Sequence, residues 1–134
     1  MIVIDASTLA KFILKEEGWE EVAEHLKAGT LSIDHVVKEV ANAVWKRFRQ
    51  GAASREVSKI MLNALKEILE RAVKVEEELT YLDRAAEIAF DRGITIYDSL
   101  YIAMAKEKGL RLLTSDEIQA SVATAENVDT ILLT

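Results

Sequence analysis

Four acidic residues stand at positions in this sequence where carboxylates are able to do chemistry. Asp5 directly follows the first apolar run of the chain, and Asp116 follows the apolar run Leu110–Leu113 after two hydroxyl residues. Asp98 stands two residues after another short apolar segment, and Glu39 lies one turn into an amphipathic stretch. Carboxylates held close together resist joint ionisation unless a cation neutralises them. Because hard oxygen ligands suit Mg²⁺ or Mn²⁺, the four acids predict a divalent-cation site if the fold brings them together.

Each of these acids also has a purely structural interpretation. Asp5 and Asp98 are both suitable N-cap residues for the helices expected after them. Asp116 would lie in a first helical turn, where the helix dipole favours a negative charge. Glu39 lies at the edge of an apolar helical stripe, where a solvated surface residue is the ordinary expectation. Spacing alone leaves both interpretations open.

The elements that must position these acids alternate between short apolar runs and amphipathic stretches. Continuously apolar runs predict strands that are buried on both faces, namely Ile2–Ile4, Leu31–Ile33, Val73–Val75, Leu110–Leu113 and Thr130–Leu133. The intervening stretches predict helices, over Thr8–Lys15, Glu20–Lys27, His35–Gln50, Ser54–Arg71, Thr80–Arg92 and Asp98–Lys108, with a further short helix before the last strand. This alternation predicts an α/β fold, a three-layer α/β/α sandwich with a mostly parallel central sheet. In such sheets the functional crevice lies at the carboxyl ends of the strands.

Length and composition set further bounds on the fold and function. The 134 residues predict one domain spanning residues 1–134. The chain has no cysteine and only two histidines, which excludes thiolate sites and argues against a multi-histidine zinc site. The net charge of −6 argues against a surface coated in positive charge for nucleic acid, although a local basic groove stays possible. Without a membrane-length apolar run or an export signal, we expect a cytoplasmic protein.

The motifs around the four acids resemble those of PIN-domain proteins, and specifically the small VapC-type toxin ribonucleases. The first two motifs resemble the segments VIDAST, around Asp5, and KEVANAVWK, around Glu39. The third and fourth resemble GITIYDSLYIAMAKEKG, around Asp98, and LRLLTSDE, around Asp116. The resemblance covers essentially the whole chain with the motifs in the right order, and it implies the PIN-like α/β/α fold.

The resemblance implies a toxin endoribonuclease that hydrolyses RNA phosphodiester bonds with Mg²⁺ or Mn²⁺. It assigns catalysis and metal binding to Asp5, Glu39, Asp98 and Asp116, and supporting roles to Ser7, Asn42, Thr114 and Ser115. It also implies a homodimer and a VapB-like antitoxin whose tail lies over the active site. No side-chain nucleophile is needed, and we interpret His35 as a helix-start residue with no chemical role.

Basic and aromatic residues offer candidate RNA contacts of lower specificity. Residues 38–59 carry a local excess of basic side chains. This excess fits either a surface that binds a phosphate backbone or an ordinary solvated helix face. The candidate RNA contacts are Lys11, Lys15, Lys46, Arg47 and Arg49. Tyr97, Tyr101, Trp19 and Trp45 are too dispersed to predict a stacking platform, so we expect core or interface positions. The many large apolar residues of Ser54–Arg71 predict core packing and, with the resemblance, a dimer contact.

Other functions compatible with clustered acids fit less well. A receiver-type signalling domain would place a lysine after its last strand, but here that strand ends at the C-terminus. An aspartate-nucleophile phosphatase would have a second aspartate two residues after the first, where Ser7 stands. A PIN fold kept as a non-catalytic RNA-binding module would have no need of the full acidic set. A metal-dependent ribonuclease is therefore the function that we expect.

Overall fold

Five strands form the central sheet of the structure, a computed structural model that describes all of residues 1–134. They are β1 (Ile2–Ile4), β2 (Thr30–Ile33), β3 (Val73–Glu76), β4 (Leu112–Thr114) and β5 (Thr130–Leu132). The strand order is β3-β2-β1-β4-β5, and every neighbouring pair is parallel. The sheet is therefore wholly parallel, and its central strand β1 is the one that leads into Asp5.

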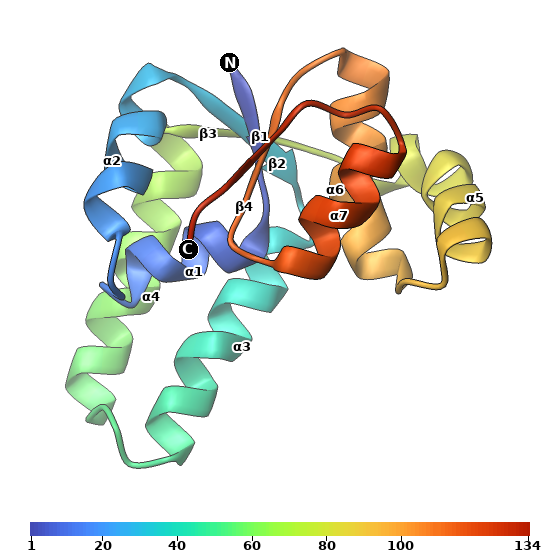
Figure 1. Cartoon of the computed structure of the whole chain (residues 1–134). Coiled ribbons are helices and arrows are strands. Elements are labelled where there is room, and N and C mark those ends of the chain that lie inside the picture. Colours follow the sequence, from blue (N-terminus) through green and yellow to red (C-terminus); the bar gives the residue numbers. More distant parts are fainter.

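Helices cover both faces of this sheet, which confirms the three-layer α/β/α sandwich (Figure 1). One layer holds α1 (Ala6–Ile13), α2 (Trp19–Ala28), α3 (Val36–Arg49) and α4 (Arg55–Arg71). The other holds the 3₁₀ helix η1 (Glu78–Tyr81), α5 (Leu82–Arg92), α6 (Ile96–Lys108) and α7 (Glu117–Ala125). Parallel pairing requires such crossovers, because the chain must return to the same end of the sheet before each new strand.

The hydrophobic core is one cluster of 30 buried residues on both faces of the sheet. Helix α6 is its most buried helix, since every residue from Ser99 to Ala105 is buried. Helix α6 contacts β1, β2 and β4 of the sheet and also α5 and α7. Because α6 is packed on all sides beyond its first turn, the first turn, which carries Asp98, is fixed relative to the carboxyl end of β1.

Most helices begin within two residues of the predicted start, and the two differences near Asp98 have a clear physical cause. The expected helix Thr80–Arg92 is divided into η1 and α5, and α5 ends at Gly93, whose φ of 71° suits a residue without Cβ. Helix α6 begins at Ile96 rather than at Asp98, because the Thr95 side chain caps it by accepting a hydrogen bond from the backbone N–H of Asp98 at 3.3 Å. Asp98 therefore lies inside the first turn and is not the N-cap.

Helices α3 and α4 form a hairpin that projects beyond the carboxyl edge of the sheet (Figure 1). The Ser54 side chain caps α4 by accepting a hydrogen bond from Val57 N–H, as the sequence predicts. None of the helices combines the length and the apolar character that crossing a membrane would need.

Candidate active site

The deepest residue of the site is Asp5, which is fully buried at the carboxyl end of β1. Its carboxylate accepts hydrogen bonds from the Thr8 backbone N–H at 3.0 Å and from the Ser7 hydroxyl at 2.9 Å. The Thr114 hydroxyl, at the end of the neighbouring strand β4, donates a third bond. Burial outweighs these bonds and raises the pKa of Asp5 to about 6. Asp5 caps α1 as the structural interpretation expects, and burial of its carboxylate disfavours the charged form.

Hydroxyl groups join the ends of β1 and β4 beneath the site. Ser7 Oγ accepts a bond from the Ser115 backbone N–H at 3.0 Å, and Thr114 Oγ1 accepts one from the Asp116 backbone N–H at 3.0 Å. The Thr8 and Ser115 hydroxyls lie 3.4 Å apart. These contacts fix the loop after β4 against the first turn of α1. Ser7, Thr114 and Ser115 therefore lie beneath the carboxylates, and their supporting role in catalysis stays a prediction.

Glu39 reaches the site from the first turn of α3. Its Oε1 atom accepts a hydrogen bond from the buried Tyr101 hydroxyl at 2.7 Å and lies 3.4 Å from His35 Nε2. Burial, together with the Glu39 charge, holds the pKa of the Tyr101 hydroxyl far above its usual value, so Tyr101 acts as a donor. The structure shows no hydrogen bond to the second carboxylate oxygen, Oε2.

Asp98 and Asp116 complete the acidic group. Burial raises the pKa of Asp98, and the charges of Asp116 and then Glu39 raise it further, so the three carboxylates act on one another. Asp116 is the N-cap of α7, since its Oδ1 accepts a bond from the Gln119 backbone N–H at 2.9 Å. The capping interpretation is therefore wrong for Asp98. Asp116, expected within a first helical turn, is instead the N-cap, and this role uses only one of its carboxylate oxygens.

Gln119 is a site residue that sequence reasoning missed. It is buried, and its amide nitrogen donates to the backbone carbonyl of Asp98 at 2.8 Å, which joins α7 to α6. Its other amide atom, Oε1, lies 3.5 Å from the Thr114 hydroxyl. Nothing in the local pattern indicates this role, because the partners of Gln119 lie on two other elements. The same is true of Tyr101, whose partner Glu39 is 62 residues away.

All four acids line one cavity of about 200 Å³ at the carboxyl edge of the sheet, which we call the carboxylate cavity. Its lining consists of Asp5, Ala6, Ser7, Ala10, Glu39, Ala43, Asp98, Tyr101, Asp116 and Gln119. No three His, Asp or Glu side chains are close enough together to form a complete metal-binding cluster. The donors are nevertheless hard oxygen atoms that repel one another, which fits a divalent cation such as Mg²⁺ or Mn²⁺ better than a softer metal.

The remaining predicted site residues lie outside this cavity. Asn42 is exposed on α3, and Ala43 rather than Asn42 lines the cavity. Three candidate RNA contacts are engaged within the chain: Lys11 donates to the Glu17 carbonyl, Lys15 lies over the Phe12 and Trp19 rings, and Arg47 pairs with Glu16. Lys46 and Arg49 are exposed on the part of α3 beyond the sheet and form no ion pair. Their contact with RNA stays a prediction.

Two curated proteins of Pyrobaculum aerophilum are similar to this chain. Ribonuclease VapC3 is 35% identical over 117 residues, which cover 86% of this chain and 88% of the relative. Exonuclease VapC9 is 33% identical over 137 residues, which cover 98% of this chain and 92% of the relative.

Solved structures and a family model agree with these relatives. The crystal structure of PAE2754 from Pyrobaculum aerophilum has a TM-score of 0.71 and 27% identity, covering 90% of this chain and 83% of that one. A toxin–antitoxin complex from Klebsiella pneumoniae shares the fold, with a TM-score of 0.63 and 14% identity over 87% of both chains. The model of the PIN domain matches residues 2–125. The arrangement of the site, the sheet order and this match together show that the chain belongs to the PIN-domain family.

Proposed function

We propose that this protein is a divalent-metal-dependent endoribonuclease, the toxin of a toxin–antitoxin pair. The observation that carries the proposal is the meeting of Asp5, Glu39, Asp98 and Asp116 around one cavity at the carboxyl edge of the sheet. Relatives more than 30% identical are named as a ribonuclease and an exonuclease, which supports nuclease chemistry. The full acidic set also favours catalysis over a PIN fold that only binds RNA.

The residues of the cavity have different roles in the proposed hydrolysis. Asp5, Asp98 and Asp116 would hold Mg²⁺ or Mn²⁺, which, when bound, polarises a phosphoryl oxygen and lowers the pKa of a water molecule. Glu39, oriented by the Tyr101 hydroxyl, keeps Oε2 available to accept a proton from that water. Ser7 and Thr114 hold the Asp5 carboxylate in place. Because water is the attacking group, no side chain forms a covalent intermediate.

The products of this reaction have distinctive ends. Attack by water releases a 3′-hydroxyl and leaves a 5′-phosphate, whereas attack by the RNA's own 2′-hydroxyl would leave a 2′,3′-cyclic phosphate. Expression of the protein alone in cells, followed by sequencing of 5′-phosphate RNA ends, identifies the target and the cut site. New 5′-phosphate ends that appear with the native protein and disappear with Asp5→Asn support the proposal. Cyclic phosphate ends, or equal cleavage by both proteins, overturn it.

Two partners follow from the same proposal. An antitoxin of the VapB kind would cover the carboxylate cavity, and the same fold is found in a toxin–antitoxin complex. A second copy of this chain would cover the α3–α4 hairpin, where a groove of about 290 Å³ is lined by Ala41, Val44, Trp45, Phe48, Arg55, Ser58, Lys59 and Leu62. Trp45 is 55% exposed there, and burial of such an aromatic surface would stabilise a homodimer.

A further inference from the structure

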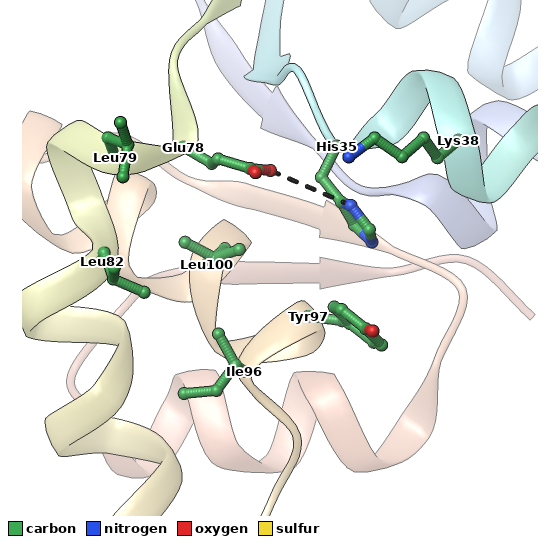
Figure 2. A pocket seen from close by; sticks show the side chains of 8 residues that line it. All are labelled: His35, Lys38, Glu78, Leu79, Leu82, Ile96, Tyr97 and Leu100. Atoms are coloured by element: carbon green, nitrogen blue, oxygen red, sulfur yellow. Dashed lines mark ion pairs between the residues drawn. The ribbon is translucent and has the colours of Figure 1, made fainter.

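A second cavity, of about 310 Å³, lies beside the carboxylate cavity and has no part in the chemistry described above (Figure 2). We call it the aromatic cavity. Its lining consists of His35, Lys38, Glu78, Leu79, Leu82, Ile96, Tyr97 and Leu100. These side chains come from the start of α3, from η1 and α5, and from the first turns of α6. The volume is at the lower end of the range for small-molecule pockets, ~300 to 1,000 Å³.

Two residues connect the aromatic cavity to the carboxylate cavity. The His35 ring lines the aromatic cavity, and its Nε2 atom lies 3.4 Å from Glu39 Oε1 in the carboxylate cavity. Tyr97 immediately precedes Asp98 in the first turn of α6, so neighbouring residues face the two cavities. An RNA strand with its scissile phosphate at the carboxylates would therefore place an adjoining nucleotide at the aromatic cavity.

The walls of the aromatic cavity suit a flat ligand with polar edges. The His35 and Tyr97 rings are stacked, with their centroids 4.7 Å apart and an angle of 14° between their planes. Tyr97 is nevertheless 59% exposed, and Leu79, at the opposite side in Figure 2, is 74% exposed. Binding of a ligand that covers these exposed side chains is favourable, because it removes apolar surface from water.

Polar groups at the rim distinguish a nucleobase from an aliphatic side chain. Glu78 Oε2 lies 3.9 Å from His35 Nδ1 and is partly exposed, so it is able to accept a bond from an exocyclic amino group. Lys38 is exposed and forms no ion pair in the structure, so it is available to a phosphate. An aliphatic side chain would cover these polar groups without pairing them, which is unfavourable.

We propose that the aromatic cavity binds the unpaired base of the nucleotide next to the scissile phosphate of a single-stranded RNA segment. The inference rests on the proposed function, because it takes RNA as the substrate. Proteins that recognise single-stranded RNA stack unpaired bases on aromatic side chains and hydrogen-bond to their edges. The base lies against the His35–Tyr97 wall and over the leucine side chains, with its amino edge toward Glu78 and its phosphate near Lys38. The cavity selects bases that carry an amino group over uracil.

The test measures base binding separately from cleavage. The probe is a short single-stranded RNA with 2-aminopurine, a fluorescent base that stacking quenches, placed at each position in turn. Binding is measured with Ca²⁺, which also takes oxygen ligands, in place of Mg²⁺, while a gel confirms that the RNA stays intact. We expect quenching at a single position next to the cleavage site mapped in Mg²⁺.

Variants of the aromatic wall identify the site of that quenching. Tyr97→Ala removes a half-exposed ring, so the fold should be kept. The variant should abolish the quenching and weaken RNA binding roughly 5- to 150-fold, because base–aromatic stacking contributes about 1 to 3 kcal/mol. Tyr97→Phe should restore both. Phe90→Ala is the matched control, because Phe90 is an exposed aromatic residue on α5 that does not line the cavity.

The outcomes separate this inference from the proposed function. RNA that is bound and cut without quenching at one position, or quenching that Tyr97→Ala leaves unchanged, overturns the inference and leaves the proposed function standing. RNA that is neither bound nor cut overturns the proposed substrate, and with it the inference.

A substrate with uracil at the quenched position should bind more weakly than one with adenine, and Glu78→Gln should reduce this difference. Equal binding of the two substrates contradicts the role of Glu78.

Discussion

Burial of the Asp5 carboxylate between two strand ends determines how the metal-free site responds to pH. Its pKa is raised by burial from an ordinary value of 3.8 to about 6, so the folded state holds the proton more tightly than the unfolded state does. The stabilisation that this proton gives is complete below pH 3.8 and is lost as the pH rises through about 6. At neutral pH the buried charge is therefore a liability unless a cation neutralises it.

The stability of the metal-free protein should thus fall as the pH rises from 4.5 to 7. The expected loss from Asp5 over this interval is about 2 kcal/mol of the roughly 3 kcal/mol that the whole shift is worth, since one pKa unit corresponds to about 1.4 kcal/mol. Asp98 contributes in the same direction, because its pKa is also raised. Urea unfolding in EDTA at several pH values measures how steeply the free energy of unfolding falls with pH. Asp5→Asn should reduce this slope, whereas Asp91→Asn, at an exposed position, should not. Stability that rises over this interval contradicts the account.

Asp98 offers the most selective change at the residue scale. Because Thr95 caps α6, Asp98→Asn removes one negative charge without removing the cap. If Asp98 holds the metal, cleavage of RNA should fall at least a hundredfold, which corresponds to about 3 kcal/mol of transition-state stabilisation. Circular dichroism should show an unchanged fold. Asp83→Asn makes the same charge change at an exposed position on α5, and equal activity of both variants would remove Asp98 from the mechanism.

The acids could be found from the sequence, and their partners could not. Asp5 comes directly after β1 and Asp116 comes two residues after β4, so the geometry of a parallel sheet places them at one edge. Tyr101 and Gln119 act through partners on other elements, and no local pattern encodes such contacts. For the same reason, the sequence did not predict the contacts of His35, which lies against Glu39 and stacks on Tyr97.

At the scale of the elements, the α3–α4 hairpin presents apolar surface that the chain itself leaves uncovered. Ile60 is 66% exposed on α4, and Trp45 is exposed on α3. The apolar residues of Ser54–Arg71 predict both a core face and a contact face, and the structure shows which of them are buried and which are exposed. Leu65 lies in the core at 3% exposure, so it is unsuitable as a dimer-contact position.

A charge at the exposed Ile60 should therefore separate the subunits, and a charge at the buried Leu65 should unfold the chain. Ile60→Glu is expected to yield folded monomers, because a stable interface of about 800 Å² per partner does not tolerate an unpaired charge at an apolar contact. Leu65→Glu is expected to lose its fold. Light scattering and circular dichroism distinguish the two results. A native protein that is monomeric at high micromolar concentration contradicts the proposed dimer.

At the scale of the whole molecule, the proposed function requires an acidic chain to bind an anionic substrate. The net charge is −6, and four of the acidic side chains meet in the carboxylate cavity. Under the proposed function, a divalent cation would reverse the local charge where a phosphate has to lie, which would couple metal binding to both stability and activity. The fold class was accessible from the alternation of apolar runs and helices, whereas the two neighbouring cavities depend on side-chain packing that the pattern does not determine.

Metal binding should raise the melting temperature of the whole domain by mass action. At a concentration of Mn²⁺ a hundred times its Kd, the gain is about 2.7 kcal/mol, which corresponds to a rise of several degrees for a domain of this size. Asp98→Asn should reduce the rise by weakening the site, and Asp83→Asn should leave it intact. Differential scanning calorimetry measures both. An unchanged melting temperature at millimolar Mn²⁺, with no binding heat, shows that the metal site is wrong.

The central claim is that the carboxylate cavity hydrolyses RNA internally with a divalent cation. Its most direct test is the cleavage of a circular single-stranded RNA, which has no end for an exonuclease. With Mg²⁺ or Mn²⁺ the native protein should linearise the circle and leave a 5′-phosphate, EDTA should stop the reaction, and Asp5→Asn and Asp98→Asn should be inactive while folded. Cleavage that persists in EDTA or in these variants, or an intact circle beside degraded linear RNA, would contradict the claim.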